Sequence, residues 1–392
     1  MITNGFTYIA VLAFIAASLV GAQKLTKSKF FEYVPPVVLL YLVGMVCCTF
    51  GVWNTAETKA AYSAVRNPIL YAMIFLMLLR CDIRQILKLG PKMLLGFFTA
   101  SVSIAIGFIA TYAIMNPVLD EGAWRGLGAL CGSWMGGSGN LVAVSDALQA
   151  TEAQLAGASI VDSIDYSIWV MFLLWAINFA PKFNKWAKAD TSKLDEVAKV
   201  ANAEVASTKK SATAADWIFL IGLSLIVSVL SQKAGAIMDK GLCAIGLDMF
   251  GAATCTTVFV TVLGLVCAVT PLGKLAAVEE LSSIYLYTVV SLLASRATLV
   301  DLVAAPMWIV YGFVILAIHV VLMFVLSKVF KWDLCMVSTA SLANIGGSAS
   351  APIVATAYDP NFAGIGVLMG VLGAAIGNFC GLGMGAILQF FA

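Results

Sequence analysis

The sequence predicts an all-α polytopic membrane protein made of two inverted repeats, each with five crossings and one Gly-Gly-containing re-entrant hairpin or broken helix. Of the 392 residues, 61% are hydrophobic and only 11% are charged, whereas a soluble domain carries roughly 25% charged residues. Apolar runs near the roughly 20 residues that cross a bilayer recur along almost the whole chain. Composition and periodicity therefore exclude a water-soluble globule and a transmembrane β-barrel.

Charge and motif content exclude several functional classes. The 23 basic and 21 acidic residues are spread over the loops, so no basic surface is expected for a nucleic-acid partner. The nine cysteines include no Cys-x-x-Cys pair, and His319 is the only histidine, so zinc and histidine-based catalytic sites are not expected. No Walker motif is present. The chain is expected to be no enzyme and to carry no cofactor or metal beyond a coupling sodium ion or proton.

The apolar runs fall into two sets of six separated by a polar stretch. They lie at 5–22, 33–52, 67–80, 92–115, 124–150 and 156–179, and then at 216–232, 250–270, 281–298, 306–328, 335–357 and 363–391. We accordingly divide the chain into a first transmembrane repeat (1–180), a cytoplasmic polar linker (181–215) and a second transmembrane repeat (216–392). The linker is alanine-rich and charged, and we expect a solvated helix with flexible ends.

Lysine placement predicts the orientation. The first apolar run has no positive charge before it, and Lys24, Lys27 and Lys29 follow it. This argues against a cleavable signal peptide and places the lysine side in the cytoplasm, with the N-terminus outside. The linker is also rich in lysine, so each half should cross the membrane an odd number of times. We expect a multi-pass protein of the bacterial cytoplasmic (inner) membrane with a cytoplasmic linker.

One run in each half is interrupted by glycine. Residues 124–150 contain GGSGN at 136–140, and residues 335–357 contain GGSAS at 346–350. Each arm has about a dozen residues, which as helix spans ~16 to 18 Å, or half a bilayer. Re-entrant hairpins at both places leave five crossings per half and invert the second half; full-length broken helices are the alternative. LYAMIFLMLLR from Leu70 also aligns with LYTVVSLLASR from Leu286.

Irregular backbone at these positions predicts a binding site. Unpaired backbone groups in hydrocarbon cost several kcal/mol each, so they are tolerated only where protein or a watery cavity satisfies them. We expect Ser138 and Asn140 to cap a helix restarting at Leu141, and Ser350 to cap one with Pro352 in its first turn. Two helix N-termini near the midplane would favour an anionic group on the solute, typically a carboxylate.

Asp162 and Asp165 are the candidate ion-coupling residues. They follow the first interrupted segment and lie three apart, on one helix face. A charge at the bilayer centre costs at least ~2.5 to 3.5 kcal/mol, so the pair is expected to face a water-filled cavity and to bind a cation or a shared proton. Placement near the interface is the alternative. His319 is expected to bond to a neighbouring backbone group.

Three stretches carry a family resemblance. CGSWMGGSGNLVAVSDAL, ANIGGSASAPIVATAY and VLGAAIGNFCGLGMG resemble the YjcL-like family of uncharacterised bacterial integral membrane proteins, over essentially the whole chain. More distantly, the chain is similar to glutamate:sodium and citrate:sodium symporters and to the cation:proton antiporter and bile-acid transporter group. This resemblance implies a solute site at the hairpin tips, formed by Gly136, Gly137, Ser138, Asn140, Asn344, Gly346, Gly347, Ser348 and Ser350.

These observations lead to one expected function and two alternatives. We expect an ion-coupled (sodium or proton) secondary transporter that moves a small, carboxylate-bearing organic solute by alternating access. Its partners are then the solute and membrane lipid, and a homodimer is an expected assembly because dimers are common in the resembling groups. A cation:proton antiporter would use Asp162 and Asp165 alone. An intramembrane enzyme or a subunit of a larger complex is the third possibility.

Overall fold

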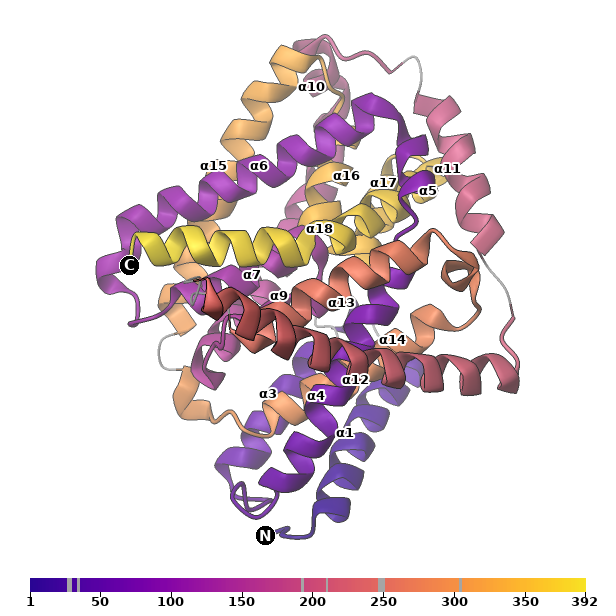
Figure 1. Cartoon of the computed structure of the whole chain (residues 1–392). Helices are drawn as coiled ribbons and strands as arrows, with labels where there is room; N and C mark the ends of the chain where they lie inside the picture. Colours follow the sequence, from indigo (N-terminus) through magenta and orange to yellow (C-terminus); the bar gives the residue numbers. More distant parts are fainter. Residues whose placement is uncertain (27–29, 34–35, 192–193, 209–210, 246–250, 303–304) are drawn as a thin grey trace.

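The computed structural model describes residues 1–26, 30–33, 36–191, 194–208, 211–245, 251–302 and 305–392. The described secondary structure is helical, apart from one isolated bridge between Ile2 and Trp53. Helices of both halves pack into one body around a shared apolar core (Figure 1). The all-α fold class is confirmed.

The helices follow the order of the predicted apolar runs, although the helix expected at 67–80 begins at Lys59 and the one expected at 216–232 extends to Ala244. In the first half they are α1 (Gly5–Thr26), α2 (Phe30–Tyr33), α3 (Pro36–Thr49), α4 (Lys59–Leu79), α5 (Ile83–Ile86), α6 (Gly90–Met115), α7 (Trp124–Gly136), α8 (Ser138–Ala147) and α9 (Glu152–Ala176). The linker holds α10 (Ala180–Ala187) and α11 (Leu194–Thr208). The second half holds α12 (Ala214–Ala244), α13 (Ala252–Ala268), α14 (Val278–Ala294), α15 (Ala305–Phe330), α16 (Leu334–Ile345), α17 (Gly347–Tyr358) and α18 (Ala363–Phe390).

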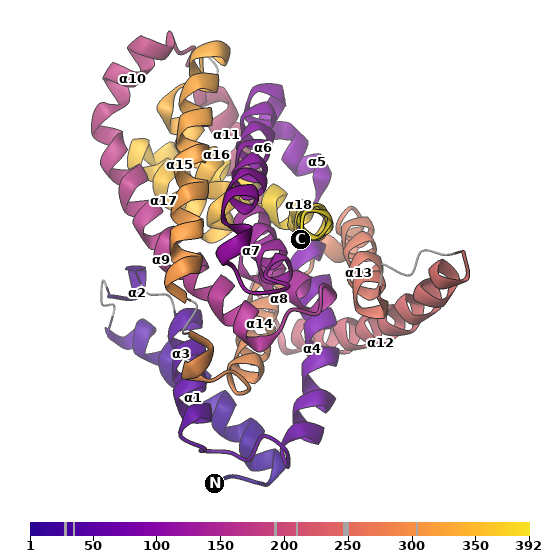
Figure 2. The same ribbon diagram turned by 90° about the vertical axis from the view of Figure 1, so that its left-hand side faces the viewer.

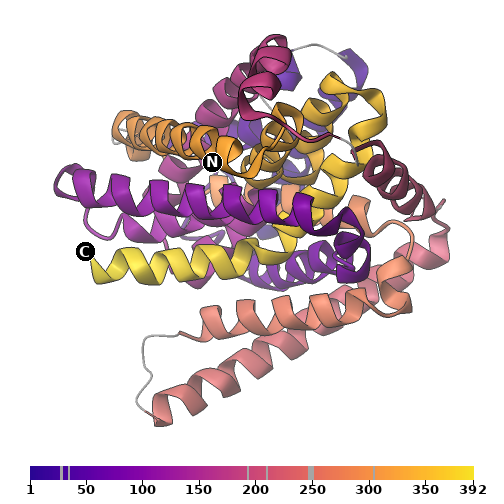
Figure 3. The same cartoon turned by 90° about the horizontal axis from the view of Figure 1, so that it is seen from above.

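Seven helices of the described residues are long and apolar enough to span a membrane: α1, α4, α6, α9, α12, α15 and α18. The ten expected crossings would also need α3, α13 and α14, which have 14, 17 and 17 residues and are roughly 21 to 26 Å long. Large apolar side chains are exposed on the outer helices, for example Ile218 on α12 and Val321 on α15, as expected of surfaces that face lipid. Figure 3 shows α12 and α13 as a pair along one edge.

The first interrupted segment is a helical hairpin. A Cβ placed on Gly128 of α7 would lie 2.6 Å from Leu148, and one on Gly132 would lie 2.9 Å from Val144. In a single continuous helix, Gly128 and Leu148 would be roughly 30 Å apart. The arms α7 and α8 therefore run antiparallel. The reversal occurs at Gly137, whose φ of +102° is rarely adopted by other residues.

The second interrupted segment folds in the same way. Gly347 has φ +66°, and the Ser338 hydroxyl of α16 lies 3.2 Å from the Tyr358 hydroxyl of α17, twenty residues later. This contact requires the two arms to fold back on each other. Both segments are thus hairpins rather than interrupted straight helices, and each has arms of 10 to 13 residues.

The expected caps at the tips are wrong. Helix α8 already begins at Ser138 after Gly137, with no side-chain cap bond, so neither Ser138 nor Asn140 precedes it. Helix α17 begins at Gly347, which places Ser350 and Pro352 inside the helix. The physical reason is that glycine makes the reversal by itself, and the helix restarts immediately after it.

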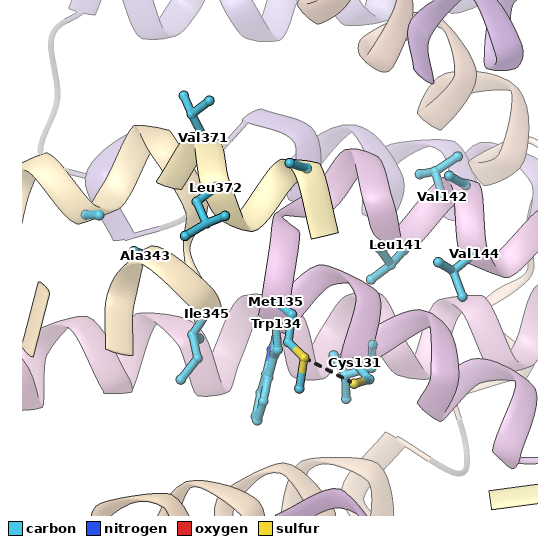
Figure 4. Packing of buried hydrophobic residues seen from close by; sticks show 14 of the residues in the cluster. Cys131, Trp134, Met135, Leu141, Val142, Val144, Ala343, Ile345, Val371 and Leu372 are labelled. Carbon is cyan, nitrogen blue, oxygen red and sulfur yellow. Dashed lines mark hydrogen bonds between the residues drawn. The ribbon is translucent and has the colours of Figure 1, made fainter. Parts of the chain in front are cut away.

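Helix α18 carries a stripe of glycines on which both hairpins pack. A Cβ on Gly370 would lie 2.3 Å from the Cα of Ser348, and one on Gly377 would lie 2.8 Å from the Cα of Gly136. Between them, a Cβ on Gly373 would lie 3.0 Å from a backbone carbonyl of each hairpin. Figure 4 shows apolar side chains at this junction, including Trp134, Ile345 and Leu372. The absence of side chains on the stripe lets both hairpins approach closely.

The linker helix is present, but one of its faces is buried. Ala198 and Ala201 of α11 are almost fully buried, and Asn202 clamps the start of α18. Its Nδ2 donates to the Asn361 carbonyl at 2.7 Å, and its Oδ1 accepts from the Gly364 amide at 2.9 Å. Figure 2 shows α11 alongside the transmembrane helices. The expected flexible ends fall at 192–193 and 209–210, outside the described residues.

Candidate functional site

Helix α9 contacts the tips of both hairpins. Asp162 accepts a hydrogen bond from the Ser133 hydroxyl at 2.8 Å and a longer one from the Ser138 hydroxyl at 3.5 Å, both in the first hairpin. One turn further on, the Tyr166 hydroxyl lies 2.5 Å from the Ser350 hydroxyl of the second hairpin. The tips also meet directly, because a Cβ on Gly347 would lie 3.6 Å from the Gly136 carbonyl oxygen. These contacts bring tip residues of both halves to one helix.

Asp162 faces a cavity of about 230 Å³. The cavity lies between the first hairpin and α9 on one side and α3 and α14 on the other. It is lined by Val37, Tyr41, Leu42, Ser138, Leu141, Val142, Leu155, Ser159, Ile160, Asp162, Ser163, Ile164, Val290 and Leu293. Asp162 is the charged residue among these described lining residues. The site therefore combines an apolar wall with one carboxylate.

Asp165 is placed differently from Asp162. It is not part of the cavity lining, its side chain is fully buried, and neither carboxylate oxygen has a hydrogen-bond partner among the described residues. A Cβ on Gly312 of α15 would lie 1.8 Å from its Oδ2, so Asp165 packs directly against α15. Residues three apart differ by about 60° around a helix, which is enough to direct the two carboxylates to different neighbours.

The two tip asparagines are used in helix packing. Asn140 donates to the Asn378 side-chain oxygen at 2.9 Å, and Asn378 donates in turn to Thr261 at 2.9 Å. Asn344 accepts from the Ser101 hydroxyl of α6 at 2.6 Å. Both asparagines are buried and neither lines the cavity. They fix the hairpins to α18 and α6.

The remaining predicted tip residues divide by their surroundings. Gly136 and Gly346 are closely packed, since a Cβ on either would lie under 3.0 Å from a neighbouring atom. Gly137 has no neighbouring heavy atom within 4 Å of such a Cβ, and Ser348 lies against Gly370. Among the nine predicted tip residues, Ser138 alone lines the cavity. The structure thus brings Ser138 together with Asp162, and Ser350 together with Tyr166.

The matching family model is described as "Protein of unknown function (DUF819)", and it matches residues 10–391. The chain belongs to this family. It is also similar to the "Uncharacterized membrane protein YjcL" of Bacillus subtilis (strain 168), with 24% identity over 399 residues, which cover 96% of this chain and 94% of that protein. The resemblance to YjcL-like membrane proteins is confirmed, and this DUF819 member is an integral membrane protein.

One buried polar cluster of this DUF819 member escaped the sequence analysis. Asp146, near the end of α8, pairs with Arg66 of α4 and accepts a hydrogen bond from the Tyr71 hydroxyl at 2.8 Å. Thr254 of α13 donates to the neighbouring Ala147 carbonyl at 2.7 Å. Asp146 interrupts an apolar run as Asp162 does, and that pattern was a signal that could have identified it. These contacts hold α8, the second arm of the first hairpin, against α4 and α13.

His319 of this DUF819 member lies in a chain of hydrogen bonds instead of bonding to the backbone. Trp169 donates to the Ser341 hydroxyl at 3.0 Å, which lies 2.8 Å from Nε2 of His319. Nδ1 lies 2.6 Å from the Ser103 hydroxyl, which donates to the Ala100 carbonyl at 2.7 Å. A neutral imidazole protonated at Nδ1 gives every donor in this series of hydrogen bonds an acceptor. The chain joins α6, α9, α15 and α16.

Multi-ligand metal sites are not found in the described part of this DUF819 member. No group of three or more His, Cys, Asp or Glu side chains there could hold a metal ion. An oxygen-rich position lies at Asp162, where the carboxylate is beside the Ser133 and Ser138 hydroxyls. Carboxylate and hydroxyl oxygens are ligands that suit a hard cation, and a carboxylate can alternatively take up a proton.

Proposed function

We propose that the protein is an ion-coupled secondary transporter that moves a small organic solute by alternating access. One observation carries this proposal: two glycine-tipped helical hairpins meet beside a membrane-embedded carboxylate, Asp162, that faces a cavity. Broken helices around a midplane site are the usual construction of secondary transporters. Ionisable side chains within the membrane mark ion pathways more often than they serve packing.

Asp162 is the coupling residue in this proposal. A cation or proton that reaches the cavity neutralises its charge and reduces the cost of keeping the group within the membrane. The same carboxylate holds the Ser133 and Ser138 hydroxyls of the first hairpin, so occupancy would change the contact between α9 and that hairpin. Because both hairpins pack on α18, they would move together, with α3 and α14 as the opposing wall.

The proposal includes the membrane topology. We assign the protein to the bacterial cytoplasmic membrane, with the N-terminus outside, the linker in the cytoplasm, and two inverted halves of five crossings and one re-entrant hairpin each. The lysines after α1 and in the linker support this orientation. The hairpin arms support re-entry, because 10 to 13 helical residues span about half a bilayer. We propose no enzymatic activity and no bound cofactor.

A cation:proton antiporter without an organic solute is the second candidate. The observation that favours it is Asp165, a fully buried carboxyl group one turn from Asp162 with no hydrogen-bond partner among the described residues. Two such groups could bind a cation and a proton in exchange. The two candidate functions differ in whether the protein binds any organic solute in a way that depends on Asp162.

Ion-dependent stability of the purified protein tests the proposal. Thermal midpoints would be measured in sodium, lithium and potassium at constant ionic strength, over a pH series. Binding to the folded state stabilises it by about 2.7 kcal/mol when the ion is at 100 times its Kd. We expect one cation, or the pH, to shift the midpoint of the wild-type protein and of an Asp120→Asn control, since Asp120 is exposed in a loop.

The Asp162→Asn variant should lose this shift while keeping its helical circular dichroism spectrum. An equal ion or pH response in Asp162→Asn and the wild-type protein would contradict the proposal, as would the absence of any response in the wild-type protein. An ion response that no organic solute changes would favour the antiporter.

A further inference from the structure

Tyr41 and Ser138 contribute hydroxyl groups to the cavity lining, and its other described polar groups, on α9, are arranged to accept hydrogen bonds. The Ser159 hydroxyl donates to the Leu155 carbonyl at 2.8 Å, and the Ser163 hydroxyl donates to the Ser159 carbonyl at 2.6 Å. With their protons committed to the backbone of α9, these hydroxyl oxygens are left as acceptors. The Asp162 carboxylate is an acceptor as well. A solute that supplies donors matches this set.

The positive end of α8 is already matched by the protein's own carboxylate. Ser138 is the first residue of α8, and its hydroxyl lies 3.5 Å from Asp162. A negative charge at a helix N-terminus is stabilised by the helix dipole and by free amide groups. Asp162 occupies the position in which the sequence analysis expected the carboxylate of a solute. A solute carboxylate would therefore face Asp162 as a like charge.

The rest of the wall is aliphatic. Nine of the fourteen described lining residues are Val, Leu or Ile, and none of the fourteen is Lys, Arg or His. The volume of about 230 Å³ corresponds to roughly seven water molecules at about 30 Å³ each. An apolar body of about ten non-hydrogen atoms would fill it and would displace water from the aliphatic surface.

We infer that the cavity binds a small apolar solute that carries one protonated amine, with the ammonium group on Asp162 and the hydrocarbon part between α9, α3 and α14. An ammonium group has three donors and no acceptor, which matches a carboxylate and two serine oxygens. The inference rests on the proposed function and names its solute class. It replaces the expected carboxylate-bearing solute with one of the opposite charge.

A matched ligand series tests the charge of the solute that the cavity binds. The probes are 2-phenylethylamine, 2-phenylethanol and 3-phenylpropanoate, which share the phenylethyl group and differ in the polar group. Binding to the purified protein would be measured by isothermal titration calorimetry at neutral pH. We expect the amine to bind at least tenfold more tightly than the alcohol or the acid. Equal binding of the alcohol, or tighter binding of the acid, would overturn the inference.

Two variants locate the binding. Asp162→Asn should weaken amine binding at least tenfold and remove the preference over the alcohol, whereas Asp120→Asn should bind like the wild-type protein. Ser159→Leu should also weaken amine binding at least tenfold, because the larger side chain fills the cavity. The described hydrogen bond of the Ser159 hydroxyl lies within its own helix, so that bond does not join α9 to a neighbour. Its control is Ser18→Leu, the same change at an exposed hydroxyl that bonds one turn back on α1. Undiminished binding in Ser159→Leu would exclude this cavity.

The inference and the proposed function can fail separately. If Asp162 governs the ion response but the amine shows no preference, the solute class is wrong and the coupled transporter stands. If the amine binds through Asp162 and neither ions nor pH have any effect, the cavity is a binding site without coupling. If neither the ion response nor amine binding depends on Asp162, both the inference and the proposed function are rejected.

Discussion

Asp146 and Arg66 form an ion pair that is largely withdrawn from solvent, with side-chain exposures of 6% and 17%. Tyr71 adds a hydrogen bond to the same carboxylate. A buried charge that loses its partner costs far more than an exposed one, because water cannot replace the lost interaction. The pair connects the first hairpin to α4, so its strength bears on how easily that hairpin can separate from α4.

We predict that Asp146→Asn destabilises the protein by about 3 kcal/mol, since it leaves the Arg66 guanidinium without its counter-ion. The measurement is the free energy of unfolding in detergent by denaturant titration. The control is Glu279→Gln, which removes the partner of Arg80 in an ion pair where Glu279 is 64% exposed; that change should cost under about 1 kcal/mol. Equal losses in the two variants would contradict the assignment.

The surroundings of individual carboxylates follow only partly from sequence. Spacing and the apolar context correctly predicted that Asp162 and Asp165 share one helix, α9. The sequence did not indicate that Asp162 faces a cavity whereas Asp165 packs against Gly312, because Gly312 lies about 150 residues further along the chain. Side-chain neighbours across such distances depend on helix rotation, and one sequence carries no direct record of that rotation.

At the scale of elements, the hairpins were more predictable than their internal details. Paired glycines and arms of half a bilayer length identified both breaks, and the structure places the reversals at Gly137 and Gly347. The predicted helix caps were wrong because the preferences of serine for the N-cap and of proline for the first turn are weak. Glycine makes the chain reversal by itself, and this decides where the next helix begins. The docking of α11 was also missed, since the alanines that it buries, including Ala201, resemble those of a solvated helix.

The glycine stripe of α18 makes a prediction about packing. Gly377→Ala would place a Cβ 2.8 Å from both Asn140 and the Cα of Gly136, so we expect a loss of roughly 1 to 3 kcal/mol from overpacking. Gly383→Ala on the same helix is the control, because no heavy atom lies within 4 Å of its Cβ position. Thermal midpoints of the two purified variants would be compared. A loss in Gly383→Ala as large as in Gly377→Ala would show that the stripe is not the cause.

At the scale of the whole molecule, the sequence predicted helical content and order well and the number of crossings less firmly. Seven described helices meet the length and apolarity of a span, and the orientation depends on lysine placement. If the linker is cytoplasmic, α12 starts inside and carries its exposed Cys243 to the outer side.

We therefore predict that a membrane-impermeant maleimide labels Cys243 in intact cells. In a Cys243→Ser background, Lys182→Cys in the linker should react only after the cells are permeabilised, because Lys182 is exposed on the expected cytoplasmic side. Mass spectrometry of the purified protein would identify the modified residue. The reverse labelling pattern would invert the topology.

The shared packing of both hairpins on α18 has a consequence for biosynthesis. Helix α18 leaves the ribosome well after α8, because it begins at Ala363, 216 residues after α8 ends at Ala147. At about 5 to 20 residues per second, the first hairpin waits roughly 10 to 40 s for the surface on which it packs. During translation its glycine-rich arms must be sheltered by other helices or by insertion factors, and the native arrangement is completed only after α18 has been synthesised.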